Sequence, residues 1–289
     1  MIPAAFQYHR PRSVDEAVAL LAEHGEEARV LAGGHSLIPM MKLRLAEPAH
    51  LIDLKGVDSL RGIAEADGAI RIGAMVTQAE IIASAPLAAA CPILREAAEL
   101  IADPQVRSCG TIGGNVANGD PGNDMPAVMM CLGASYVLHG PGGDRAVAAR
   151  DFYEGTFETA AKDDEVLIAV DVPIPPSGQG QAYAKMKRKV GDYATAAAAV
   201  ALTMDGGTCR AASIALTNVA PTPLHAAAAG EDLVGTAVDG AAIDQAVASA
   251  VEITDPVSDL RGPAEFRKHT AGVMTRRAIE AALGRTKGA

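Results

Sequence analysis

The fold of this chain is decided by two diglycine loops, LAGGHSL at residues 31–37 and CGTIGGN at residues 109–115. A glycine pair puts no Cβ atom between the backbone and a ligand, and it tolerates positive φ angles. Successive backbone N–H groups in such a turn form a concavity that binds anions. Two of these loops in one chain predict a clamp on two phosphates, and hence a bound dinucleotide.

These loops differ from the common nucleotide-binding motifs. The chain has no G-x-G-x-x-G between a predicted strand and helix, and no G-x-x-x-x-G-K-[ST]. One diglycine alone most often marks a tight turn, but here hydrogen-bonding side chains follow each pair, His35 and Ser36 in one loop and Asn115 in the other. His35 is either a catalytic base or a loop residue whose ring contacts the ligand, and we favour the second role.

Composition limits the class of protein. With 289 residues, 49% of them hydrophobic and 21% charged, the chain is long enough for two globular domains. Its net charge of −10 and its 3% aromatic content argue against a nucleic-acid surface. No secretory signal pattern and no apolar run near the ~20 residues of a membrane helix occur. We therefore expect a cytoplasmic protein whose contact with a membrane is peripheral at most.

Motifs for covalent or metal chemistry are missing from the sequence. The four cysteines lack C-x-x-C spacing, which argues against a zinc site, an iron–sulfur cluster and a disulfide framework. Neither a nucleophile elbow nor an H-E-x-x-H sequence occurs. The histidines show no partner at catalytic spacing, so we assign the chain no catalytic residue and no metal ligand.

Local patterns predict a small βαβ-like unit at the start of the chain. A capping box at Ser13 and Glu16 begins its first helix, and Gly25 ends that helix. Pro39 begins a second, short helix. The elements expected after the first helix are a strand at residues 28–32, a helix at 40–45 and a strand at 50–54.

A second group of elements follows from about residue 62. It opens with a hairpin that turns at Asp67-Gly68, and a capping box at Thr77 and Glu80 begins its first helix. Pro104 should stop the next helix, and Asp124 should cap the one after it. Helices are expected at residues 92–102 and 125–132, and strands at residues 135–139, 146–148 and 166–172.

A Pro- and Gly-rich linker, PIPPSGQG at residues 173–180, predicts a domain boundary. We place an N-terminal domain at residues 1–176, with subdomains at about 1–55 and 56–176, and a C-terminal domain at 177–289. The C-terminal domain should be a small antiparallel sheet backed by helices. Its strands are expected at residues 182–187, 196–204 and 211–218, and its helices at residues 241–253 and 264–283.

Two charged segments have more than one interpretation. The turn-rich DPGND at residues 120–124 supplies a helix cap, a carboxylate for ribose hydroxyls, or both. The basic KMKRKVGDY at residues 185–193 is one of two things. It is a solvated edge strand, or it places one cation against a phosphate or a flavin edge and Tyr193 against a flat ring.

Three motifs together are similar to those of a known family. The motifs are AGGHS at 32–36, TIGGN at 111–115 and KRKVGDYAT at 187–195. Their order and spacing resemble those of the FAD-binding medium subunits of the xanthine dehydrogenase family of molybdenum hydroxylases. Within that family they most resemble the aerobic carbon monoxide dehydrogenases. The resemblance implies an α+β fold, with an FAD-binding PCMH-type domain of two α+β subdomains. A C-terminal domain of antiparallel sheet plus helices, of the CO dehydrogenase flavoprotein type, would follow and close over the flavin.

The resemblance also implies an FAD site between the subdomains. Both loops would hold the pyrophosphate through backbone N–H groups and through hydroxyl and amide side chains. Asp124 would bind the adenosine ribose or its surroundings, and Leu167 the adenine or isoalloxazine region. Lys185 would lie at the flavin side, and Tyr193 would cover one face of the isoalloxazine. The implied cofactor-binding residues are Ala32, Gly33, Gly34, His35, Ser36, Thr111, Ile112, Gly113, Gly114, Asn115, Asp124, Leu167, Lys185 and Tyr193.

Partners and reaction are implied in the same way. Enzymes of this family hold [2Fe–2S] clusters on a small subunit and a molybdopterin cytosine dinucleotide centre on a large subunit, in a dimer of heterotrimers. This chain would take electrons from CO oxidation (CO + H2O to CO2) through the clusters to FAD, and on to a quinone or another acceptor. Three alternatives remain: a related aldehyde or N-heterocycle dehydrogenase, a stand-alone flavin oxidoreductase, and a non-enzymatic nucleotide-binding or scaffold protein.

Overall fold

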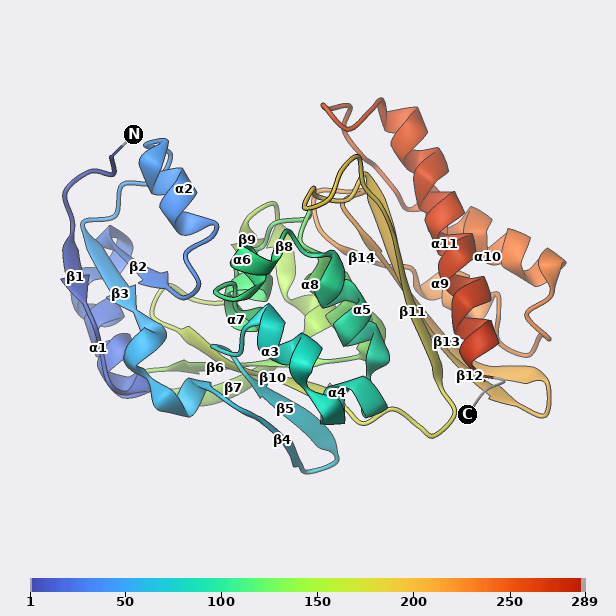
Figure 1. Cartoon of the computed structure of the whole chain (residues 1–289), viewed down its shortest axis with the longest axis horizontal. Coiled ribbons are helices and arrows are strands. Elements are labelled where there is room, and N and C mark those ends of the chain that lie inside the picture. The colour runs from blue at the N-terminus through green and yellow to red at the C-terminus, as the bar shows by residue number, and fades with distance from the viewer. Residues whose placement is uncertain (1, 287–289) are drawn as a thin grey trace.

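The computed structural model describes residues 2–286 and arranges them in three consecutive units (Figure 1). The first unit is a three-stranded parallel sheet with the strand order β1-β3-β2. Helix α1 packs on this sheet and buries Ala17, Val18 and Leu21 in the local core. The elements are β1 (Gln7–His9), α1 (Val14–His24), β2 (Ala28–Leu31), α2 (Leu37–Lys42) and β3 (His50–Asp53).

The capping signals of the first unit are confirmed only in part. The capping box at Ser13 lacks its reciprocal bond, because the Glu16 carboxylate accepts a hydrogen bond from the Arg12 N–H at 2.8 Å rather than from the Ser13 N–H. Ser13 accepts a hydrogen bond from the Glu16 N–H at 3.1 Å, and Gly25 ends α1 with φ +51°. The predicted start of the second helix is wrong, because α2 begins at Leu37 rather than at Pro39. Proline is tolerated at this third helical position, since the first N–H groups of a helix have no intrahelical acceptor.

The second unit is a five-stranded antiparallel sheet of order β4-β5-β10-β6-β7, with helices packed on one face (Figure 1). A short two-stranded ribbon, β8 (Tyr153–Gly155) and β9 (Glu158–Thr159), lies beside it. The sheet strands are β4 (Ile63–Ala66), β5 (Ala69–Gly73), β6 (Ser135–Gly140), β7 (Gly143–Ala148) and β10 (Val166–Pro173). The helices are α3 (Gln78–Ala83), α4 (Ala85–Ala90), α5 (Pro92–Leu100), α6 (Pro104–Arg107), α7 (Ile112–Ala117) and α8 (Asp124–Leu132).

Of the three helix signals predicted in this unit, the structure confirms one and corrects two. The capping box at Thr77 and Glu80 is confirmed, with both reciprocal hydrogen bonds present. Pro104 does not stop the preceding helix but is the first residue of α6, a position that proline favours. Asp124 does not cap α8, because it is the first helical residue. Asn123 occupies the cap position, and its side chain makes no capping hydrogen bond.

The third unit is a four-stranded antiparallel sheet of order β11-β12-β13-β14 backed by helices, as predicted (Figure 1). Its strands are β11 (Gly180–Met186), β12 (Ala196–Asp205), β13 (Thr208–Thr217) and β14 (Leu224–His225). Its helices are α9 (Ala227–Glu231), α10 (Gly240–Glu252) and α11 (Ala264–Thr286). The short β14 and α9 have no sequence signal of their own and are held by their contacts with β13.

The alanine-rich strand β12 explains how the third unit joins the second. Its alternate residues Ala197 and Ala199 belong to the core shared with α5 and α8, whereas Ala196 and Ala198 pack toward α11. A strand buried on both faces needs apolar side chains throughout, and small ones let helices approach from both sides. The second and third units therefore share a core, which brings β11 close to α8.

Two general findings concern the described residues. No helix among residues 2–286 is both long and apolar enough to cross a bilayer. Cys91, Cys109, Cys131 and Cys209 are all unpaired thiols, which agrees with the absence of a disulfide pattern in the sequence.

Candidate functional site

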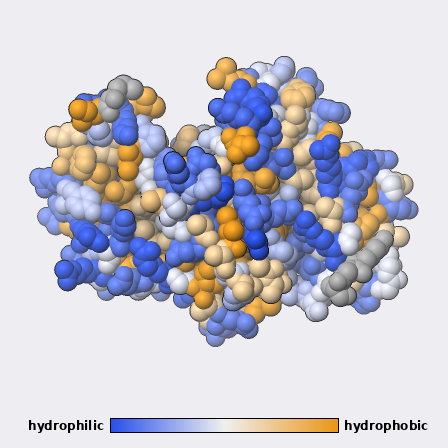
Figure 2. Space-filling model, in the orientation of Figure 1, coloured by the Kyte–Doolittle hydropathy of each residue, from blue (hydrophilic) through white to orange (hydrophobic). Residues whose placement is uncertain are grey.

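A cleft of about 910 Å³ lies where the three units approach one another. Both diglycine loops line it, together with β10, the end of β11 and the segment around Tyr193. The outline of the molecule is notched between the N-terminal unit and the remainder (Figure 2). Of the residues expected to bind the cofactor, all except Ile112 line this cleft.

The two loops contact one another backbone to backbone. A Cβ atom on Gly33 would lie 2.4 Å from the carbonyl oxygen of Cys109 and 2.8 Å from the Cα atom of Gly110. Neither distance leaves room for a side chain, so the contact between the loops itself requires glycine at position 33. Gly34 has φ +78°, which glycine adopts at little cost. The fold thus brings the loops together, as the clamp hypothesis requires.

The first loop presents unused backbone donors. Within residues 2–286, the N–H groups of Gly33, Gly34, His35 and Ser36 donate to no protein acceptor. Backbone N–H groups in folded proteins seldom lack a partner unless water or a ligand supplies one. Because these four groups are consecutive and line the cleft, the loop has the donors that a pyrophosphate requires.

The second loop uses its donors within the protein. The N–H groups of Ile112 and Gly113 bond to carbonyl oxygens of the turn after β5, at 2.8 and 2.9 Å. Those of Gly114 and Asn115 bond to the hydroxyl and carbonyl oxygens of Thr111, at 3.1 and 3.0 Å. The expectation of successive free N–H groups is therefore wrong for this loop. The Ile112 side chain is fully buried in the core and does not line the cleft, so a contact of this residue with the cofactor stays a prediction.

The second loop contributes an amide side chain, that of Asn115, to the lining of the cleft. The Oδ1 atom of Asn115 is buried and has no hydrogen-bond partner among the described residues. A second amide in the same cleft, that of Gln78, is only 1% exposed, and neither its nitrogen nor its oxygen has a partner. Leaving one such buried group unpaired costs about 1–3 kcal/mol. Both amides therefore have unused hydrogen-bonding capacity beside the cleft.

Gln78 was missed by the sequence analysis. It is the first residue of α3, directly after the Thr77 cap, and its N–H bonds to the Gly110 carbonyl oxygen at 2.9 Å. This bond ties the helix start to the second loop. A glutamine at a helix start is unremarkable in sequence, and only the tertiary packing shows that its amide is buried without a partner.

A buried ion pair forms another part of the cleft wall. The Nζ atom of Lys185 lies 2.7 Å from Oδ2 of Asp124, with side chains only 1% and 5% exposed. The hydroxyl of Tyr183 donates to Oδ1 of Asp124 at 2.6 Å. Burial raises the pKa of the Asp124 carboxyl, while Lys185 and the Tyr183 hydroxyl act in the opposite direction. Lys185 is therefore not part of a solvated edge, although β11 is an edge strand.

This pair also bears on the expected ribose contact of Asp124. Both carboxylate oxygens already accept a hydrogen bond from β11, so the carboxylate primarily fixes α8 to that strand. Removing one partner of such a pair leaves a buried charge uncompensated. The ribose role of Asp124 stays a prediction. The structure shows that Asp124 and Lys185 both line the cleft and that their side chains are almost fully buried.

Tyr193 lies at the mouth of the cleft and is 42% exposed. Its ring packs on Gly122, where a Cβ atom would lie 2.8 Å from the ring, and the Arg261 guanidinium lies 5.4 Å from the ring centre. Burial and the Asp120 carboxylate raise the pKa of the Tyr193 hydroxyl to about 12. The hydroxyl is therefore neutral at physiological pH, and the side chain presents a flat, uncharged face.

Leu167 and His35 complete the predicted set. Leu167 lies on β10 at a register shift against β6 and is almost fully buried. His35 is exposed beside the second loop, and its ring forms no hydrogen bond to a side chain or backbone group of residues 2–286. A histidine without an orienting partner is poorly placed to act as a general base, so the ligand-contact role is the better supported one.

Comparisons with known proteins agree with this geometry. Residues 4–175 match a family described as the FAD binding domain in molybdopterin dehydrogenase, and residues 181–282 match the CO dehydrogenase flavoprotein C-terminal domain. The carbon monoxide dehydrogenase medium chain of Afipia carboxidovorans is 62% identical over 287 residues, which cover 99% of this chain and 100% of the relative. That of Hydrogenophaga pseudoflava is 49% identical, and the match covers 99% of each chain.

A solved structure of the Cu,Mo-CO dehydrogenase contains a chain that superposes with a TM-score of 0.98 at 62% identity, covering 99% of this chain and 100% of that one. The α+β fold expected from the sequence is confirmed by this match and by both domain families. The chain therefore belongs to the family of FAD-binding domains of molybdopterin dehydrogenases, and it has the domain pair of the carbon monoxide dehydrogenase medium chains.

Proposed function

We propose that this chain binds FAD in the cleft and serves as the electron-transferring subunit of an aerobic carbon monoxide dehydrogenase. The observation that supports this most is the row of four unused N–H donors at Gly33–Ser36, held against the second loop inside the cleft. The full-length similarity to carbon monoxide dehydrogenase medium chains supports the choice of reaction.

The chain's residues fit FAD in three ways. The N–H groups of the first loop would bind the pyrophosphate oxygens. The amides of Asn115 and Gln78 would give their buried polar atoms partners on the cofactor. Gly114 lines the cleft without a side chain, so the backbone of the second loop leaves space for the ligand.

The flavin end of the cofactor would lie toward β11 and the segment that follows it. Lys185 supplies a buried cation there, which pairs with Asp124, and the Tyr183 hydroxyl donates to the same carboxylate. Tyr193 would cover one face of the isoalloxazine ring and limit its contact with water. FAD, when bound, supplies the redox chemistry, while the chain binds, orients and shields it.

The remaining components of the enzyme would be on other chains. The described residues that line the cleft include no activated nucleophile or oriented base, so substrate oxidation would take place on a partner. We propose a small subunit with [2Fe–2S] clusters and a large subunit with a molybdopterin cytosine dinucleotide centre, assembled as a dimer of heterotrimers. CO + H2O would yield CO2, two protons and two electrons on the large subunit, and a quinone would receive the electrons from this chain.

The domain boundary belongs to the same proposal. FAD binding would reside in residues 1–176, with subdomains at about 1–55 and 56–176, and residues 177–289 would form the C-terminal domain. The two matched families, at 4–175 and 181–282, and the connection between β10 and β11 support this division.

Purification of the complex tests the proposed function. Tag-free chain expressed with its two proposed partners should co-purify with both, contain one FAD per chain, and reduce a quinone analogue when CO is added. A variant that lacks FAD should retain CO-dependent reduction of the iron–sulfur clusters but not of the quinone. Quinone reduction by the isolated chain with its own organic substrate would instead support a stand-alone flavin oxidoreductase.

A further inference from the structure

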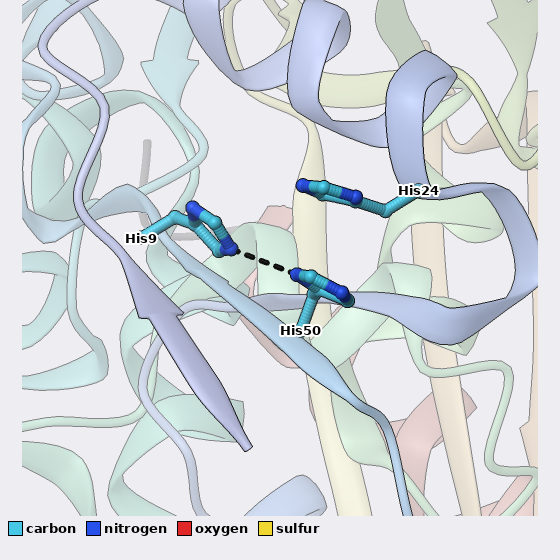
Figure 3. Close-up of side chains that lie close together, drawn as sticks. All are labelled: His9, His24 and His50. Atoms are coloured by element: carbon cyan, nitrogen blue, oxygen red, sulfur yellow. Dashed lines mark hydrogen bonds between the residues drawn. The ribbon is translucent and has the colours of Figure 1, made fainter.

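Three histidines gather on the N-terminal unit, on elements that do not include the diglycine loops (Figure 3). His9 is the last residue of β1, His24 the last residue of α1, and His50 the first residue of β3. One ring nitrogen from each lies within 4.8 Å of the other two, and all three side chains are half-buried. The parallel pairing of β1 with β3, and the packing of α1 on that sheet, bring them together.

The cluster has few partners within the protein. Nε2 of His9 and Nδ1 of His50 share one hydrogen bond of 2.9 Å. Within residues 2–286, that is the only hydrogen bond made by these three rings, so the other four ring nitrogens are left for a ligand or water. His24 stacks on His50 with ring centres 3.7 Å apart and an interplanar angle of 12°.

We propose that His9, His24 and His50 form a binding site for one divalent transition-metal ion of the zinc class. Imidazole nitrogen is a preferred ligand of zinc, nickel, cobalt and copper, whereas magnesium and calcium prefer oxygen. Three protein ligands leave a fourth position for water or another group. His24 also lies in the last turn of α1, an 11-residue helix whose C-terminal end favours a positive charge.

Metal binding requires a limited local movement. Zinc–nitrogen bonds of about 2.0–2.1 Å with tetrahedral angles place ligand nitrogens roughly 3.3 Å apart. The cluster must therefore contract from its present span of up to 4.8 Å. A metal ion lies close to the plane of each ring that binds it, so His24 must rotate out of its stack on His50. His24 is the last residue of α1, and its ring forms no hydrogen bond to residues 2–286, so rotation of the ring breaks none.

No metal ligand was predicted from the sequence, and the structure explains why the three histidines form no recognisable sequence motif. The three histidines have none of the short spacings of known zinc motifs. Two strands and a helix have to pack before the rings meet. The site is also independent of FAD, because none of the three residues lines the cleft.

Zinc titration of the FAD-loaded, tag-free full chain tests the proposal. In competition with a chromophoric chelator, the chain should bind one Zn²⁺. The variant His24→Gln should bind it at least about tenfold more weakly, since losing even an outer-shell partner of a metal ligand costs about 10–100-fold. Co²⁺ substituted at the site should show the visible absorption of a low-coordinate nitrogen site in the wild type and not in the variant.

Two further variants make the outcome decisive. His269→Ala, which removes an exposed histidine on α11, should leave Zn²⁺ affinity unchanged. His50→Gln should weaken it as His24→Gln does, and unchanged FAD content will show that these variants are folded. Equal Zn²⁺ affinity in the wild type and both cluster variants, or equal loss in His269→Ala, would overturn the proposal.

Discussion

Replacing Gln78 with methionine separates a structural role of this residue from a role in binding the cofactor. In the ligand-free chain, the Gln78 side chain is 1% exposed and both polar atoms of its amide lack partners. A buried unpaired polar group costs about 1–3 kcal/mol, and an apolar group of similar shape removes that cost. Gln78→Met should therefore raise the free energy of unfolding of the FAD-free chain by about 1–3 kcal/mol.

The same substitution should weaken FAD binding. If FAD gives the amide its missing partners, the wild type regains this energy on binding and the variant does not. A loss of about 1–3 kcal/mol corresponds to a dissociation constant that is roughly 5- to 150-fold higher. Urea unfolding of the deflavinated chain gives the first quantity, and titration of FAD fluorescence gives the second.

Gln105→Met is the matched control, because Gln105 is exposed on α6 and away from the cleft lining. It should change neither quantity appreciably. A Gln78→Met variant that binds FAD as tightly as the wild type would show that the amide does not contact the cofactor. A less stable FAD-free variant would refute the interpretation that the amide is buried without a partner.

Three further predictions follow from the cleft and the third unit. Gly114→Val should lower the ratio of bound FAD to protein, and Gly33→Ala should do the same. Gly33→Ala should lower the thermal stability of the FAD-free chain more than Gly114→Val does, because its Cβ atom meets backbone at 2.4 Å, whereas a Cβ atom at Gly114 meets the Thr111 hydroxyl at 3.0 Å. Normal FAD content in both variants would refute the role of the loops. Lys185→Met should reduce the free energy of unfolding by about 3–5 kcal/mol, and a second substitution, Asp124→Asn, should recover most of it in urea titrations. Burial lowers the pKa of His225 from 6.5 to about 4, so between these values the unfolded chain binds more protons than the folded one. Stability that is complete above about pH 6.5 should therefore decline toward pH 4, and a His225→Gln variant with the same slope of stability against pH would contradict this.

Local signals in the sequence predicted much of the secondary structure. The helix cap at Ser13, the capping box at Thr77 and the turn at Asp67-Gly68 each depend on neighbouring residues, and all three are confirmed, although the Glu16 carboxylate does not complete a capping box with Ser13. Pro104 was ambiguous for a physical reason, since proline both follows the end of one helix and begins the next. Asp124 was misassigned because a carboxylate near a helix start resembles a cap until its partner on β11 is known.

The candidate site was predictable in outline but not in its hydrogen bonding. The sequence identified both loops and the basic segment, and the fold places them around one cleft. It did not show that the N–H groups of the second loop are bonded within the protein. Two of their acceptors lie on the distant turn after β5, and the other two are oxygens of Thr111 at the start of α7. Nor did it show the unpaired amide of Gln78 or the gathering of His9, His24 and His50, which depend on tertiary packing alone.

An experimental structure of the FAD-loaded chain tests the central claim most directly. We expect density for the two phosphates within hydrogen-bonding distance of the backbone nitrogens of Gly33, Gly34, His35 and Ser36, and the amide of Asn115 turned toward the cofactor. Phosphates bound elsewhere in the molecule, with those four nitrogens still lacking a ligand, would contradict the account.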